Sequence, residues 1–599
     1  MRRFWRVSIL GLAVASVAGA YWQGKDQRAV SQRNLFFSSN VKADFRWSPP
    51  RVIDASIKFP TPTRSSLLAE TKRGAIVNLA VTYAPDSRLR DSVTLDMDDH
   101  RVVLKRRRRT KDGISFVGPM HLSADEVHEL LQPPKSNTKR FQESVPIFKD
   151  RMVIGRRPIP KVLKDQALNL DQITRRKGVI FLPPFTMTVP SDPSRSLMIT
   201  DLGVVEDPTR TFNPCTGTGT AMGKWTFGHL MSEMANKAQT GIDPSDFVRK
   251  WLENWMSTQT VNGDSVAART QIENVIIKPW EAASGVAAGG KLDLAKAPFR
   301  LLAIVNRLDL RSNGAYGGGT AGEARFVFCA MDPQCNPLQF TVIFEYGVPI
   351  SGCRKVRAWA QKWADLTNFN PGTANYNDRL QAITDVFSSA GANPAKPNGS
   401  ALNQLRTDEI ALAGPWELRE FTLKNPGSSF LIEDTVKQNP IPGLNRHPII
   451  KDYVDTHQSS LLSDTDVVPL NFNGQDFLGG HSLNNQDFWD SRSVSGTPAE
   501  IMNAEARFRF SKNTCDGCHG AETNTGFTMV HPAPFGSQAG LAGFLTGITV
   551  TDPATPLPPG PWPASRTFND LARRQQDLDQ LANRICLFQI FFRPLKQVH

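Results

Sequence analysis

Two cysteines and a histidine near the C-terminus have the spacing of a haem-attachment motif. Residues 514–520 read Thr-Cys-Asp-Gly-Cys-His-Gly, which places Cys515 and Cys518 three residues apart, with His519 directly after them. Two thiols at this spacing reach the two vinyl groups of one porphyrin, and the imidazole that follows falls beneath the iron. The chain has only seven Cys and ten His in 599 residues, so the run is rare by chance. We therefore expect one covalent haem c, with His519 as proximal iron ligand.

Two other uses of these thiols have to be weighed. Cys515 and Cys518 could form a disulfide, or they could provide half of a zinc site. No second Cys-x-x-Cys run and no paired histidine motif completes a tetrahedral zinc set. A redox disulfide commonly lies in a thioredoxin-like βαβ unit, and no such pattern surrounds the motif. Haem attachment is the favoured interpretation, and a disulfide stays open as the alternative.

Candidates for the sixth iron ligand follow the motif closely. His531 is the first choice and Met529 the second, because a returning loop could bring either one over the porphyrin. Met502, His481 and the terminal His599 are more remote candidates. An open sixth position is a further alternative, and it would favour ligand binding or peroxide chemistry over electron transfer alone.

Helices are predicted on both sides of the motif. Residues 499–510 have a helical pattern. Downstream, Ser565 or Thr567 can cap a helix, and apolar residues then recur at three- and four-residue spacing as far as Ile585. In its motif, flanking helices and length, the segment 498–599 resembles a small c-type cytochrome. The resemblance implies a small helical haem domain that transfers electrons.

The N-terminus predicts export. Arg2, Arg3 and Arg6 precede an apolar stretch over residues 7–20 that ends in Ala-Gly-Ala, as in a cleavable signal peptide. This stretch is too short to span a bilayer comfortably, and no cysteine follows it for a lipid anchor. We expect a periplasmic or extracellular protein without an integral membrane domain after cleavage. An uncleaved N-terminal anchor is the alternative.

Five cysteines lie outside the motif, and an oxidising compartment would let them pair. We expect up to two disulfides and one spare thiol among them. The spacing suggests a pair within Cys329, Cys335 and Cys353 but does not decide which. The five are Cys215, Cys329, Cys335, Cys353 and Cys586.

The length of 599 residues predicts a multidomain α+β protein. Strand-like runs with turn residues between them mark the first part, for which an immunoglobulin-like sandwich is one form. The expected parts are a signal peptide (1–20), a linker (21–45), a basic β-rich domain (46–195), a mixed α/β domain (196–497) and a small helical cytochrome-c-like domain (498–599).

Positive charge is concentrated near the N-terminus. Residues 21–200 contain 32 Lys and Arg against 18 Asp and Glu, while the whole chain has a net charge of +13. The densest run, Lys105–Arg109, continues a strand-like segment and meets a turn, which favours the solvated tip of a β-hairpin. A basic domain can also bind an anionic polymer or surface. Nucleic acid is not an expected partner, because no nucleic-acid-binding signature accompanies the run.

The middle region shows clear periodicities. Amphipathic helices are predicted over Phe247–Trp255, Val356–Leu366 and Tyr376–Phe387. Arg325–Met331 and Gln339–Tyr346 are predicted to form a strand hairpin.

Two charged runs in the middle region could carry acid–base chemistry. Arg406–Glu409 and Glu417–Glu420 lie beside Trp416 and Phe421, and paired carboxylates are the catalytic groups of glycoside hydrolysis. Structural ion pairs between helices are the favoured interpretation. The glycine loop 317–319 lacks the Lys-Ser/Thr of a phosphate-binding loop.

Three strings connect most of the chain to a wider group. They are Asn-Arg-Leu-Asp-Leu-Arg at 306–311, Trp-Glu-Leu-Arg-Glu-Phe at 416–421, and the segment 513–523 around the motif. With these strings, residues 196–530 look like a group of large secreted bacterial proteins of unknown function. The resemblance implies export and a cytochrome-like end, without a reaction.

The sequence therefore predicts one-electron transfer by a covalent haem outside the cytoplasmic membrane, to a redox partner that the sequence does not identify. One alternative is a haem-containing redox enzyme with a substrate site in residues 196–497. The other is a haem-free secreted binding protein with a structural disulfide between Cys515 and Cys518.

Overall fold

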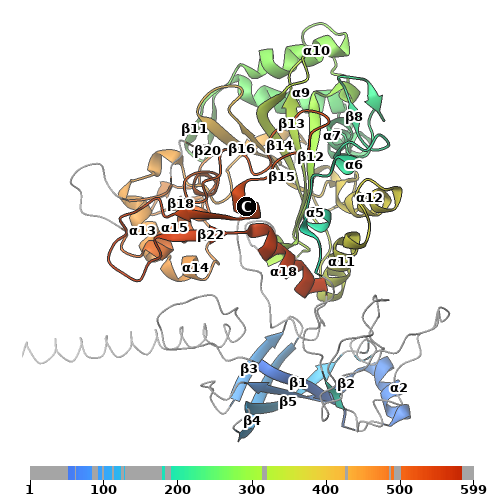
Figure 1. Cartoon of the computed structure of the whole chain (residues 1–599), viewed down its shortest axis with the longest axis vertical. Coiled ribbons are helices and arrows are strands. Elements are labelled where there is room, and N and C mark those ends of the chain that lie inside the picture. The colour runs from blue at the N-terminus through green and yellow to red at the C-terminus, as the bar shows by residue number, and fades with distance from the viewer. Residues whose placement is uncertain are drawn as a thin grey trace, which may run out of the picture. The chain divides into compact units, whose positions relative to one another are not determined.

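The structure is a computed structural model in which two compact units can be described (Figure 1). Both contain helices and antiparallel sheets, which confirms the mixed, multidomain fold class. The expected signal peptide and linker lie outside the described residues. The structure describes residues 52–60, 63–83, 92–97, 100–110, 113–122, 124, 127, 179–181, 190–312, 320–424, 429–484, 488–491 and 501–582.

The first unit, which contains the described residues up to 181, is built on one antiparallel sheet. Its strand order is β3-β4-β5-β2-β1-β6. One face buries apolar side chains such as Val77, Leu79 and Phe116. The elements are β1 (Val52–Lys58), α2 (Arg64–Arg73), β2 (Ala75–Tyr83), β3 (Ser92–Met97), β4 (His100–Thr110), β5 (Gly113–Leu122) and β6 (Val179–Phe181).

The basic run Lys105–Arg109 lies in β4, directly before the β4–β5 hairpin turn, as predicted. All its side chains except the half-buried Arg106 are exposed. The described strands form a single sheet, whereas an immunoglobulin-like sandwich needs two packed sheets. The finer expectation for this region is therefore not supported.

The second unit, residues 190–582 as described, is organised around a larger antiparallel sheet. Its strand order is β17-β16-β15-β14-β13-β12-β7, and β20 also pairs with β16. The predicted hairpin is present as β13–β14. The strands are β7 (Met198–Ile199), β12 (Phe299–Arg307), β13 (Glu323–Met331), β14 (Pro337–Gly347), β15 (Leu402–Glu409), β16 (Trp416–Leu423), β17 (Leu431–Asp434) and β20 (His481–Asn484).

The central strands of this sheet present two different faces, because successive side chains point to opposite sides. On one face, Phe344 of β14 lies 5.4 Å from the ring of Phe328 in β13, and both rings contact Phe227 from a covering helix. On the other face, Arg325 of β13 is directly opposite Glu345 of β14. We refer to these as the aromatic face and the charged face.

Helices cover the aromatic face (Figure 1). The three predicted amphipathic helices are confirmed, and their apolar residues, Trp251, Trp359 and Phe387 among them, are buried. The helices are α7 (Phe227–Ala235), α9 (Pro244–Leu252), α10 (Lys278–Ser284), α11 (Cys353–Asp365) and α12 (Ala374–Ser388). Shorter ones are α5 (Pro193–Ser196), α6 (Leu202–Val205) and α8 (Lys237–Thr240).

The C-terminal segment belongs to the same unit and packs against the sheet. One continuous hydrophobic core includes Trp251 from α9, Phe328 from β13, and Cys518, Phe544 and Leu578 from the last hundred residues. The boundary expected at residue 498 therefore does not divide the structure, because this apolar surface is buried against the middle region. The segment contains α15 (Ala504–Lys512), α16 (Cys515–His519), α17 (Gly543–Thr546), β21 (Ile548–Thr551), β22 (Ser565–Phe568) and α18 (Asp570–Ala582).

A smaller lobe holds the start of this segment. Tyr453, Phe477 and Trp489 form a second core with Phe510 of α15. The lobe also contains α13 (Pro448–Thr456), α14 (Gln458–Leu462), β18 (Asn471–Phe472) and β19 (Gln475–Asp476). No helix among the described residues is long and apolar enough to cross a membrane.

Candidate functional site

The Cys-x-x-Cys-His motif forms a one-turn helix, α16, that is completely buried. Thr514 caps the helix by accepting a 3.0 Å hydrogen bond from the backbone of Gly517. Cys515, Cys518 and His519 are 0%, 1% and 4% exposed. Both cysteines are thiols outside any disulfide. Burial raises the pKa of Cys518 to about 12 and raises that of Cys515 still further, so both keep their protons at neutral pH.

Side chains from the sheet and the lobe hold α16 in place. Asn439 both donates to the carboxylate of Asp516 and accepts from its backbone N–H, and Ser482 donates to the same carboxylate. Asn484 of β20 donates to the carbonyl oxygen of His519. At Gly517, a Cβ atom would lie 2.1 Å from the carbonyl oxygen of Ser511, so only glycine fits against the end of α15.

The imidazole of His519 is held in one orientation and one tautomer. Its Nδ1 lies 2.8 Å from the carbonyl oxygen of Phe527, and since a carbonyl only accepts, Nδ1 carries the proton. Nε2 then carries the lone pair. The ring stacks on Trp416 with centroids 5.2 Å apart. Burial lowers the pKa of His519 to about 4, so the ring is neutral at pH 7. These are the properties of a metal-ligating histidine.

His519 lines a cavity between the charged face and the C-terminal segment. The cavity has a volume of about 60 Å³, which is room for a few water molecules and lies well below the roughly 300–1,000 Å³ of small-molecule sites. Met529 lines it too, whereas neither thiol is among the described residues of the lining. Besides Met529, seven apolar side chains line the cavity: Met198, Val305, Val327, Ile343, Leu418, Val530 and Leu545. Its charged lining residues are Arg307, Arg325, Glu345, Arg406, Asp408 and Arg574.

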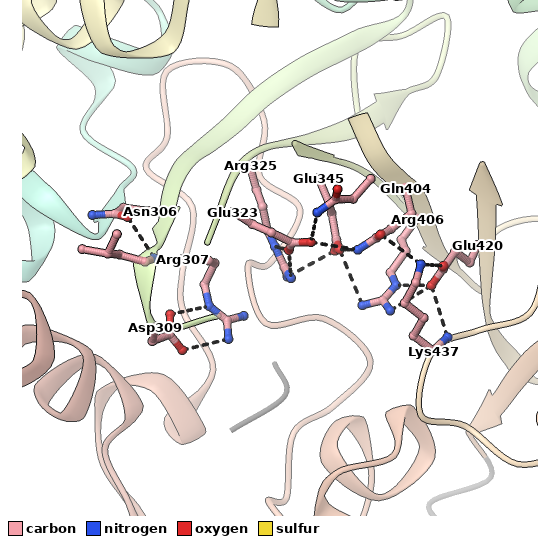
Figure 2. A network of polar contacts seen from close by, with 12 residues as sticks. Asn306, Arg307, Asp309, Glu323, Arg325, Glu345, Gln404, Arg406, Glu420 and Lys437 are labelled. Carbon is pink, nitrogen blue, oxygen red and sulfur yellow. Dashed lines mark hydrogen bonds and ion pairs between the residues drawn. The ribbon is translucent and has the colours of Figure 1, made fainter. Parts of the chain in front are cut away.

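Figure 2 shows how the charges of the sheet connect. Glu345 lies between Arg325 at 3.1 Å and Arg406 at 3.7 Å, and Arg406 continues to Glu420 at 2.9 Å. Arg325 also pairs with Glu323 at 2.8 Å. The network crosses four strands, and Gln404 and Lys437 complete it through hydrogen bonds and an ion pair. Each buried charge in it thus has a counter-charge.

Asp408 lies in the same part of the cavity wall but does not belong to this network of ion pairs. The hydroxyl of Thr341 donates to its carboxylate at 2.8 Å, but no described cation forms an ion pair with it. Burial raises the pKa of Asp408 to about 7, with Glu345 adding to the effect. The cavity therefore contains one carboxyl group that titrates near neutral pH.

The candidates for the sixth ligand are now separated by position. Met529 is half-buried and lines the cavity with His519. His531, the first choice from the sequence, is exposed, lies outside the lining, and has its Nδ1 3.3 Å from the hydroxyl of Thr528. Alternation along an extended chain would have placed Met529 and His531 on the same side, but it is Met529 and Val530 that both line the cavity.

The more remote candidates lie elsewhere. Met502 is 58% exposed. His481 belongs to a separate buried cluster, in which its Nδ1 lies 2.9 Å from Glu417 and its Nε2 lies 3.7 Å from Asp264. His599 is outside the described residues. Met529 is thus the candidate that the fold brings together with His519.

The charged runs at 406–409 and 417–420 lie on strands β15 and β16, and the helices expected for them were wrong. Arg406 pairs with Glu420 on the charged face, while Arg269 pairs with Glu409 and Glu417 at 2.6 and 2.8 Å on the opposite side. Their interpretation as structural ion pairs is confirmed.

The disulfides differ from the pairing suggested by spacing. Cys335 is bonded to Cys215, 120 residues away in sequence, and not to Cys329 or Cys353. Proximity in sequence was misleading because β13 carries Cys329 into the core, where it stays a thiol. Cys353 is in a disulfide, but its partner lies outside the described residues. Cys586 also lies outside the described residues.

The residues around His519 include donor groups suited to an iron porphyrin, but the space of about 60 Å³ between them is far smaller than the ring, and neither motif thiol lines it. A neutral imidazole and a thioether, two groups that ligate haem iron, line one cavity. Eight apolar side chains line the cavity beside six charged ones, and the four arginines among the charged ones are paired with carboxylates of the chain. Both thiols lie within four residues of His519 on the same helical turn. Among the described residues, no group of three or more His, Cys, Asp or Glu could hold a metal ion directly.

Sequence reasoning placed Arg406 and Asp408 in a charged run, and Arg307 and Arg325 in other segments, but did not bring them together in one cavity wall. Charged residues at two-residue spacing, as in Glu323-x-Arg325 of β13 and Arg406-x-Asp408 of β15, were the available signal. Residues at this spacing point to the same face of a strand. Comparisons of the chain with protein-family models, with curated proteins and with solved structures found no match.

Proposed function

We propose that the protein is an exported c-type haem protein that transfers single electrons. Cys515 and Cys518 would hold the porphyrin through thioether bonds, and His519 and Met529 would be the axial ligands. The observation that carries this proposal is the shared cavity: the histidine of the attachment motif and a downstream methionine line the same apolar space. A chance Cys-x-x-Cys-His run would have no reason to adjoin such a cavity.

The chain itself prepares His519 for this role. Donation from Nδ1 to the carbonyl of Phe527 fixes the tautomer, and stacking on Trp416 limits rotation of the ring. Burial keeps the imidazole neutral, so no proton has to leave before it ligates. When bound, haem would supply reversible one-electron chemistry, and methionine as second ligand favours a higher potential than histidine would.

The apolar walls and the buried thiols would exclude water from the site. Val305, Val327 and Ile343 project from three neighbouring strands into the cavity. A low-dielectric surrounding strengthens the influence of the nearby charges on the iron. The potential of the centre is thus expected to depend on the charged face.

Export is supported by the cysteines. The bond between Cys215 and Cys335 is typical of proteins from oxidising compartments, where covalent haem attachment also takes place in bacteria. The thiols that remain, Cys329, Cys515 and Cys518, are buried and protected. We propose that the redox partner is another protein. Because the motif is buried, the haem would exchange electrons with this partner through the protein surface.

The test is to express the full chain with its N-terminal segment in a host that assembles c-type haem and to weigh the mature polypeptide. The expected mass includes one porphyrin, and the Soret band survives acid–acetone extraction. A matched pair of variants assigns the bonds: Cys515→Ala with Cys518→Ala releases the haem on extraction, whereas Cys329→Ala retains it. Thiol titration after unfolding provides an independent count, with two fewer thiols in the loaded protein than in the unloaded one.

A mature protein without the porphyrin mass would contradict the proposal and leave a haem-free binding protein. Loaded protein that turns over peroxide or an oxidisable substrate would instead favour the redox enzyme. Met529 argues against this second outcome, because a ligated methionine would close the sixth position.

A further inference from the structure

The sheet of the first unit has one face that stays exposed. In β2 and β4, Val77 and Leu104 are completely buried on the core face, so their neighbours Ile76 and Val103 lie on the opposite face. Among the described residues of this unit, these two are the large apolar side chains that stay exposed, at 54% and 50%. Single exposed aliphatic residues are common, so the meaning of these two depends on what lies beside them.

The pairing register shows how far this face extends. Asn78 of β2 is opposite Pro119 of β5 and Lys58 of β1, and all three are exposed. Lys105 of β4 is opposite Val117 of β5. Directly opposite residues of antiparallel strands share a face, so the exposed side chains belong to one surface over the neighbouring strands β4, β5, β2 and β1. We refer to this surface as the outer face.

A β-bulge adds positive charge to the outer face. Strict alternation after Lys105 would place Arg108 on the core face. The register shift between Arg106 and Arg108 inserts Arg107, and it brings Arg108 opposite Ser115 on the outer face. Lys105, Arg107 and Arg108 are exposed, and none of the three forms an ion pair with another residue in the described part of the chain. Their charge is therefore available to a partner.

Carboxylates do not balance these cations. In the described strands, two acidic positions share the outer face by register, namely Asp54, opposite Thr82, and Asp96, opposite Arg101. They stand against five cationic positions on the same face, so the outer face has a net positive charge. The five are Lys58, Arg101, Lys105, Arg107 and Arg108.

We propose that the outer face docks on an anionic lipid bilayer. The unpaired cations attract phosphate-bearing headgroups, and Ile76 and Val103 enter the headgroup region between them. This combination favours a bilayer over a soluble anionic polymer, which offers charge but no apolar layer. Docking of this kind retains the protein at a membrane surface. The inference goes beyond the proposed electron transfer and does not require bound haem.

The test is cosedimentation of the full chain with phosphatidylcholine vesicles that contain or lack phosphatidylglycerol. We expect binding to the anionic vesicles alone, and a decrease in binding as salt screens the attraction. Each cation near an anionic surface contributes roughly a five-fold factor, so Lys105→Glu with Arg108→Glu should lower the partition coefficient by at least about 25-fold. The matched control is Lys224→Glu with Lys355→Glu, which makes the same change in net charge at exposed lysines of the second unit and should bind almost like wild type.

A second pair of substitutions tests the apolar contribution. Ile76→Thr with Val103→Thr keeps β-branched side chains in both strands and removes aliphatic surface. We expect this variant to bind anionic vesicles several-fold more weakly than wild type, with unchanged binding to soluble polyphosphate. All four substituted positions of the first unit are exposed, so folding should be retained. The salt dependence of wild type tests the charge contribution without any substitution.

The outcomes decide between the possible partners. Loss of vesicle binding in the charge variant, weakening in the threonine variant and retention in the control support the bilayer. Polyphosphate that binds as tightly as the vesicles, with no effect of the threonine substitutions, overturns the bilayer and identifies an anionic polymer. Wild-type protein that binds neither vesicle also overturns the inference. The proposed haem function is unaffected by each result, because it is tested by the mass of the mature chain.

Discussion

Two adjacent residues of β14 show how differently the two faces of the central sheet are buried. Phe344 and Glu345 are both 0% exposed. The rings of Phe344 and Phe328 meet edge-on, with centroids 5.4 Å apart. Burial of Phe344 requires only that apolar neighbours pack closely around it. Glu345 requires two arginines from neighbouring strands. The aromatic face is thus stable by itself, whereas the charged face depends on every partner, and it is this dependent face that adjoins the candidate site.

The largest effects are expected when either of these two residues is truncated. Phe344→Ala leaves a cavity and Glu345→Ala leaves two buried cations short of a carboxylate, and we expect each to lower the free energy of unfolding by about 3–5 kcal/mol. Urea unfolding measures both. Only Glu345→Ala is expected to change the absorption spectrum of the bound haem, since Glu345 lines the cavity. A loss below about 1 kcal/mol for Glu345→Ala would mean that the network contributes little.

The charged face should also make stability depend on pH through Asp408. Its pKa is about 7 in the folded protein and near 4 when unfolded, so the folded state holds a proton that the unfolded state releases between these values. Stability therefore falls as pH rises from about 4 to about 7, by up to about 1.4 kcal/mol per pH unit, and levels off above.

Asp408→Asn removes this contribution, which urea titrations at several pH values would detect as a flatter profile. Glu409 and Glu433, whose pKa values burial raises to about 6 and about 7, add slopes of the same sign in both proteins, so the difference isolates Asp408. Thr341→Val removes a hydrogen bond that favours the charged form and should extend the slope to higher pH. Parallel profiles for wild type and Asp408→Asn would refute this assignment.

A smaller effect on stability is expected from the residues that face the charged sheet across the cavity. Met529→Leu conserves volume, so its cost should stay below about 1.5 kcal/mol, but it should lower the reduction potential by removing an iron ligand. His531→Leu, at an exposed position two residues away, should change stability by no more than about 0.5 kcal/mol and leave the potential unchanged. The reverse pattern would restore His531 as the ligand.

The smallest effect is predicted for Cys329, which lies on β13 in the row of Arg325 and Val327. Burial raises the pKa of its thiol to about 11, so the native protein should not react with iodoacetamide at this site. Mass spectrometry of the alkylated protein measures the modification. Labelling of native protein would show that this end of the charged face opens to solvent.

The sequence was sufficient for elements whose periodicity is simple. Helices α9, α11 and α12 and the hairpin β13–β14 follow from apolar spacing. Strands β15 and β16 did not, because the side chains of Arg406, Asp408 and Glu420 hide the alternation that marks a strand. Charges are ordinarily taken as solvent-exposed, and only the partners on neighbouring strands reveal that these are buried.

The candidate site could likewise be predicted only in part from the sequence. Cys515, Cys518 and His519 are visible as a local motif, but the choice of Met529 over His531 depends on which residues of this segment reach the cavity. That is decided by residues more than 100 positions apart that line the same cavity, such as Val530 and Ile343. The pairing of Cys215 with Cys335 escaped prediction for the same reason.

Gly517 has a structural role in the attachment motif that is separate from the chemistry of haem attachment. Attachment of a porphyrin uses the two sulfur atoms and the imidazole, so it does not depend on which residue stands at position 517. The folded structure does depend on it, because a methyl group at position 517 would collide with the carbonyl oxygen of Ser511. A Gly517→Ala polypeptide should thus still acquire its cofactor and then fail to close around it, so that cofactor acquisition and correct assembly become separable events.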